Sequence, residues 1–71
     1  MMKNENLSKS IDIINMPKPI TNLMKDNNII LVEDLCKKTK TDLKRMSLSF
    51  YEINQIDVKL QLMGLCLKGT I

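Results

Sequence analysis

The sequence predicts an all-α fold, a compact bundle of four to five short helices. Two observations lead to this fold class: apolar residues recur at helical spacing along the chain, and two capping-box sequences mark the starts of helices. A chain of 71 residues has room for one small domain, which buries only about 60% of the surface that its unfolded chain exposes. We therefore expect a single helical domain over residues 11–71, preceded by a polar, disordered tail over residues 1–10.

The first apolar stretch, residues 11–14, is expected to be an extended lead-in to the first helix. Proline disfavours helical backbone in the residue before it, and the segment 16–19 contains two prolines. A helix can begin at Pro19, because proline is tolerated in the first turn, and it should end among the turn-forming residues 26–28. Three apolar residues then share one face of this helix: Ile20, Leu23 and Met24.

Residues 29–32, all apolar, have two interpretations. They could form a buried strand, but the chain offers no clear second strand, and a lone strand leaves its backbone unpaired. We therefore expect a short helix over residues 31–38, in which two acids precede two bases, the order that suits the helix dipole. Its inward side chains would be those of Val32, Leu35 and Cys36.

Capping boxes define the last two helices. Thr39 with Asp42 begins a helix of less than two turns, and Ser49 with Glu52 begins the longest helix, which Gly64 is placed to end. The buried stripe of the longest helix would consist of Ile53, Ile56, Leu60 and Met63. The predicted core of the domain comprises Leu23, Val32, Leu35, Leu43, Leu48, Ile53, Ile56 and Leu60.

Composition narrows the classes of function. The net charge of +3 and the isoelectric point near 9.0 permit a nucleic-acid or acidic-protein partner without requiring one. Cys36 and Cys66 are expected to be free, buried thiols, since a redox pair would need them close in space, and the chain has no histidine for a zinc site. Neither a nucleophile beside a base nor a phosphate loop is visible. We expect no cofactor, no metal and no enzymatic activity.

The chain also lacks an apolar run near the roughly 18 residues that span a bilayer, and it lacks the apolar region of a signal peptide. We therefore expect a cytoplasmic monomer that does not associate with membranes.

The order of elements over residues 13–67, two short helical segments, a turn and a longer helix closed by glycine, resembles the C-terminal domain of the bacterial RNA polymerase alpha subunit. Apolar and capping positions carry most of the resemblance. It implies helix-hairpin-helix-like units and a stand-alone domain that acts in transcription through weak contacts with DNA, with RNA polymerase or with a regulator. The alternative is a protein-interaction module that kept this fold and lost DNA binding.

Two regions of this family contact DNA, and both are altered here. The arginine that the family inserts into the minor groove aligns with Pro19, while its asparagine aligns with Asn22; Lys18 replaces the arginine only in part, because it lacks the guanidinium fork. In the turn before the last helix, Ser49 keeps a helix-capping group, but Glu52 brings a negative charge to the phosphate position. The resemblance implies four candidate DNA-binding residues: Lys18, Asn22, Ser49 and Tyr51.

Basic residues gather instead around residues 37–45, a region that the family uses to contact activator proteins. Such a run is typical of a solvated face, and it also suits a partner of opposite charge. Phe50 is open to two interpretations, a core residue or an exposed aromatic of the kind found in protein interfaces. The candidate partner-binding residues are Lys37, Lys38, Lys40, Lys44, Arg45 and Phe50.

Overall fold

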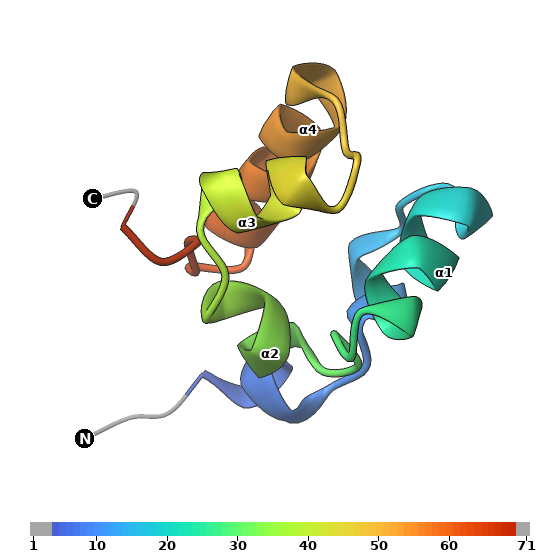
Figure 1. Ribbon diagram of the computed structural model, residues 1–71. Coiled ribbons are helices and arrows are strands. Elements are labelled where there is room, and N and C mark those ends of the chain that lie inside the picture. Colours follow the sequence, from blue (N-terminus) through green and yellow to red (C-terminus); the bar gives the residue numbers. More distant parts are fainter. Residues whose placement is uncertain (1–3, 70–71) are drawn as a thin grey trace.

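Four α-helices follow two short 3-10 turns in the computed structural model, which describes residues 4–69 (Figure 1). The elements are η1 (Glu5–Ser8), η2 (Ile11–Ile14), α1 (Lys18–Asp26), α2 (Val32–Cys36), α3 (Lys40–Arg45) and α4 (Phe50–Leu62). The described part of the chain contains no strand, only one isolated bridge between two extended residues. The predicted all-α fold class is confirmed. In Figure 1, α3 and α4 form one side of the view and α1 the other.

The N-terminal segment differs from the expected disordered tail, because residues 4–10 pack on the domain. Ser10 forms an antiparallel bridge with Leu31, and η1 packs on α2. The side-chain amide of Asn4 donates a hydrogen bond of 2.6 Å to the carbonyl oxygen of Met63. Residues 1–3 of the expected tail lie outside the described residues.

The same bridge explains the extended backbone of residues 29–31. The amide of Ile11 donates to the carbonyl of Ile30 at 3.0 Å, and the amide of Val32 donates to the carbonyl of Lys9 at 2.9 Å. The segment therefore finds its backbone partner in residues 9–11, which the sequence pattern does not mark as a strand. The expected helix over residues 31–38 is present in shorter form as α2, for which Leu31 is the N-cap.

Residues 11–14 also differ from the prediction, since they form a 3-10 turn rather than an extended lead-in. Residues three apart lie on the same side of a 3-10 turn, so Ile11 and Ile14 are both buried. The turn ends at Asn15, whose φ of 56° is left-handed. The prolines then act as expected: α1 has Pro17 at its N-cap and Pro19 in its first turn, and begins one residue before the predicted start.

Both predicted capping boxes are formed. The Thr39 hydroxyl accepts from the amide of Asp42 at 3.0 Å, and the Asp42 carboxylate accepts from the amide of Thr39 at 3.0 Å. Ser49 and Glu52 make the equivalent pair at the start of α4, with distances of 3.2 and 2.8 Å. At its other end α4 is followed by Gly64 with a φ of 76°, a left-handed conformation that suits glycine.

The capping carboxylates make stability depend on pH. The backbone amide of Leu31 lowers the pKa of Asp34, and that of Thr39 lowers the pKa of Asp42. A carboxyl group whose pKa is lower in the folded than in the unfolded chain stabilises the fold above its unfolded pKa, which is about 3.9, and this stabilisation is lost as pH falls through the folded value.

We therefore expect the melting temperature to fall as the pH is lowered from about 5 to 2, and to fall less steeply in the Asp42→Asn variant. Thermal denaturation followed by circular dichroism, at several pH values in this range, gives the slope of melting temperature against pH for each protein. Equal slopes would show that this cap does not contribute to the acid sensitivity.

Apolar side chains from every helix form one core. Of the predicted core residues, Val32, Leu35, Leu43, Leu48, Ile53, Ile56 and Leu60 are buried, and only Leu23 is half-buried. The core also contains residues outside that list: Ile11, Ile14, Met16, Ile20, Met24, Ile29 and Leu67. Of these, Ile20 and Met24 lie on the apolar face predicted for the first helix. Met63, predicted for the buried stripe of α4, is half-buried and packs at the edge of the core.

Candidate functional site

A hollow of about 310 Å³ lies between α3 and the first residue of α4. It is lined by Lys40, Thr41, Lys44, Arg45 and Phe50, and we refer to it as the basic hollow. All four predicted partner-binding residues from α3 and α4 therefore meet at one place. The other two, Lys37 and Lys38, follow the end of α2 and do not line it.

Phe50 is a surface residue, with 67% of its area exposed. The ammonium nitrogen of Lys44 lies 3.3 Å from the centroid of its ring, a cation–π contact. This settles the two interpretations of Phe50: it is not part of the core. The contact joins a side chain of α3 to one of α4.

Two helix caps determine where the side chains of the basic hollow lie. The Thr39 cap begins α3, so that Lys40 and Lys44, four residues apart, lie on the same helix face. The Ser49 cap makes Phe50 the first residue of α4, and buried Leu43 lies in the core that α3 and α4 share.

The side chains that line the basic hollow carry a net positive charge. Lys40 is partly neutralised, because its ammonium nitrogen lies 3.6 Å from a carboxylate oxygen of Asp57 on α4. Lys44 and Arg45 are exposed and near the end of α3, where cations are favoured by the helix dipole. The surface can therefore attract a carboxylate and at the same time offer an aromatic ring.

The predicted DNA-binding residues fall in two separate places. Lys18 and Asn22 are exposed on α1 and line a hollow of about 580 Å³ that Asp12 and Lys25 also line. Lys25 pairs with Asp12 at 3.1 Å, and its hydrogen bond is the main cause of the lowered pKa of Asp12. One of the two cations of this hollow is thus neutralised within the chain.

Ser49 and Tyr51 lie at the start of α4. A helix N-terminus binds phosphate through free backbone amides, but here the amides of Ser49 and Glu52 are already bonded within the capping box. The carboxylate of Glu52 also adds a negative charge where a phosphate would approach. The capping box therefore already engages two of the amides at this turn.

The cysteines are free and half-buried. Burial, and to a smaller extent the neighbouring Cys66, raises the pKa of the Cys36 thiol, which favours the unreactive protonated form. The C-terminal segment is held near α2 because the amide of Lys68 donates to the carbonyl of Lys38 at 3.0 Å.

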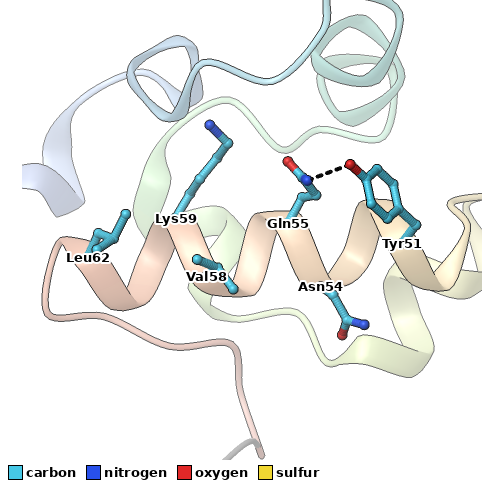
Figure 2. Close-up of a pocket in the computed structure, with 6 residues that line it drawn as sticks. All are labelled: Tyr51, Asn54, Gln55, Val58, Lys59 and Leu62. Carbon is cyan, nitrogen blue, oxygen red and sulfur yellow. Dashed lines mark hydrogen bonds between the residues drawn. The ribbon is translucent and has the colours of Figure 1, made fainter.

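A third surface, on the outer side of α4, was not recognised from the sequence. Tyr51, Val58 and Leu62 are 72%, 54% and 83% exposed, and they border a hollow of about 340 Å³ (Figure 2). The Tyr51 hydroxyl accepts a hydrogen bond of 2.9 Å from the side-chain amide of Gln55. The signal in the sequence is a second set of apolar residues at helical spacing, on the side away from the buried stripe.

Within residues 4–69, no helix is both long and apolar enough to cross a membrane. No protein-family model matches the sequence, and a comparison with curated proteins found no match.

Proposed function

We propose that this chain is a protein-interaction module that binds an acidic segment of a partner protein through the basic hollow. The observation that carries the proposal is the meeting of three cations and one exposed aromatic ring around a single hollow. Carboxylates of the partner pair with Lys44 and Arg45, and an apolar side chain packs on Phe50. Arginine and aromatic residues are the types that contribute most to protein interfaces.

The resemblance to the polymerase alpha domain supplies the context of the proposal. We propose that the partner belongs to transcription, either RNA polymerase itself or a regulator. Binding of this kind needs no cofactor, metal or catalytic group, so the proposed role is not enzymatic. The substitution at Pro19 and the closed cap at Ser49 support a change of ligand from DNA to protein.

The test is a fluorescence anisotropy titration with a labelled peptide in which aspartates flank a phenylalanine. We expect binding at low salt that weakens as salt rises, because exposed charges are screened. The Lys44→Glu/Arg45→Glu variant should lose at least about tenfold in affinity, since each substitution replaces an attraction with a repulsion.

Lys37→Glu/Lys38→Glu is the matched control, because it changes the net charge equally outside the basic hollow. Its loss in affinity should be several-fold smaller. Equal losses in the two variants would show that only net charge attracts the peptide, and would overturn the proposal.

Weak DNA binding is the second candidate, favoured by the shared hollow of Lys18 and Asn22. The same titration with an A·T-rich duplex should show low affinity that falls steeply with salt, since a few lysines hold phosphate without reading sequence. Tight binding at physiological salt that Asn22→Ala abolishes would favour the DNA function over the protein-binding one.

A further inference from the structure

The outer face of α4 carries a seam at coiled-coil spacing. Tyr51, Gln55, Val58 and Leu62 are separated by four, three and four residues, the spacing of the positions that pack between two helices in a heptad repeat. The opposite face of α4 packs in the core through Ile53, Ile56, Asp57 and Leu60. This helix therefore has one apolar face that the domain covers and a second that the described residues leave exposed.

The seam is symmetric about its own centre, because the separations read the same in both directions. A second copy of α4 running antiparallel would place Tyr51 opposite the partner's Leu62, and Gln55 opposite the partner's Val58. Each pair then occurs twice about a two-fold axis, as a closed dimer interface requires. The hydrogen bond to Tyr51 supplies a partner for the Gln55 amide when it enters such a seam.

The charges beside the seam favour the same arrangement. Glu52 and Lys59 are seven residues apart and lie along the same side of α4; Figure 2 shows Lys59 pointing to the side of Gln55 and Tyr51. An antiparallel copy brings Glu52 beside the partner's Lys59, and Lys59 beside the partner's Glu52. A parallel copy would place each of these charges beside a neutral residue of the partner and would lack the pairing of opposite charges.

A neighbouring hollow extends the face at the C-terminal end of α4. It has a volume of about 210 Å³, and Ile13, Leu62 and Met63 are among the residues that line it. In the antiparallel arrangement the partner's Tyr51 reaches Leu62 at this hollow, where its ring can pack against Ile13. This hollow therefore gives the partner's Tyr51, the largest side chain of the seam, an apolar surface to pack against.

We propose that the outer face of α4 binds a second copy of this chain, in a two-fold symmetric antiparallel helix pair. A helix of 13 residues is about 20 Å long, so the interface is smaller than the roughly 800 Å² per partner of standard protein complexes. The dimer is accordingly reversible and depends on concentration. It uses a surface distinct from the basic hollow, so each proposal can fail without the other.

Sedimentation velocity of the full chain from about 10 µM to 1 mM tests for the dimer. We expect the sedimentation coefficient to rise with concentration, and the dissociation constant to increase at least about tenfold in Val58→Glu, which places a charge in the seam. Phe50→Glu is the matched control: it adds the same charge at an exposed position outside the seam and should leave the dissociation constant within about twofold. Circular dichroism shows that both variants are folded. A monomer at 1 mM, or equal effects of the two variants, would overturn the proposal.

Disulfide trapping tests the orientation. In a Cys36→Ser/Cys66→Ser background, Tyr51→Cys and Leu62→Cys proteins are mixed with oxidised glutathione, which is reduced as protein disulfides form. Antiparallel pairing predicts that the mixed disulfide between the two variants exceeds either homodimeric product several-fold. Preference for the homodimeric disulfides would indicate a parallel pair and contradict the proposed arrangement.

Discussion

Replacing Leu60 with alanine is expected to lower the free energy of unfolding by about 2–5 kcal/mol, because it removes buried methyl groups and leaves a cavity. Leu60 is fully buried in the middle of the core face of α4. Since small domains have total stabilities of only about 5–15 kcal/mol, this loss would unfold a substantial share of the molecules or bring the protein close to unfolding. Urea denaturation followed by circular dichroism measures it.

Leu62→Ala provides the control within the same helix. Leu62 is 83% exposed, so truncating it removes little buried area, and we expect a change in unfolding free energy within about 0.5 kcal/mol. Similar losses of unfolding free energy in the two variants would mean that the buried and the exposed face of α4 are assigned wrongly. Measurements at about 5 µM protein keep self-association from contributing to either value.

The second large effect concerns the carboxylate of Asp57, which is buried between α3 and α4. One of its oxygens accepts from Gln61 at 3.2 Å and lies 3.6 Å from the ammonium of Lys40; the other is buried without a hydrogen-bond partner among the described residues. Replacing Lys40 with methionine leaves this charge uncompensated, and we expect a loss of about 1–2 kcal/mol, below the value for a fully buried pair because Lys40 is partly exposed.

Replacing both partners should reverse the loss. In Lys40→Met/Asp57→Leu the buried charge is gone and apolar groups fill the space, so the stability should return to the wild-type value or exceed it. Urea denaturation of the two single variants and the double variant gives the coupling energy. Additive effects would show that the ion pair does not join α3 to α4.

Local chemistry explains which parts of the fold the sequence could predict. The Thr39 and Ser49 caps, the prolines before α1 and Gly64 after α4 each act within a few residues, so they define helix ends without knowledge of the rest of the chain. The buried stripe of α4 follows from helical spacing in the same way. These elements were predicted within one or two residues.

Features that depend on distant residues could not be predicted in this way. The carbonyl of Ile30 accepts from the amide of Ile11, about twenty positions earlier, and nothing in the pattern of either segment indicates this pairing. The exposure of Phe50 depends on how α3 packs against α4, which helical spacing alone does not determine. The basic hollow was therefore predicted as a set of residues, but its shape and the position of the aromatic ring were not.

The contact between Asn4 and Met63 has a consequence for the order in which the protein folds. These residues are 59 positions apart, so the bond closes a loop that includes most of the chain, and closing a long loop costs conformational entropy. Distant contacts of this kind form slowly compared with single helices. During synthesis, Asn4 leaves the ribosome well before Met63, so this hydrogen bond can form only after the helices between them have been made.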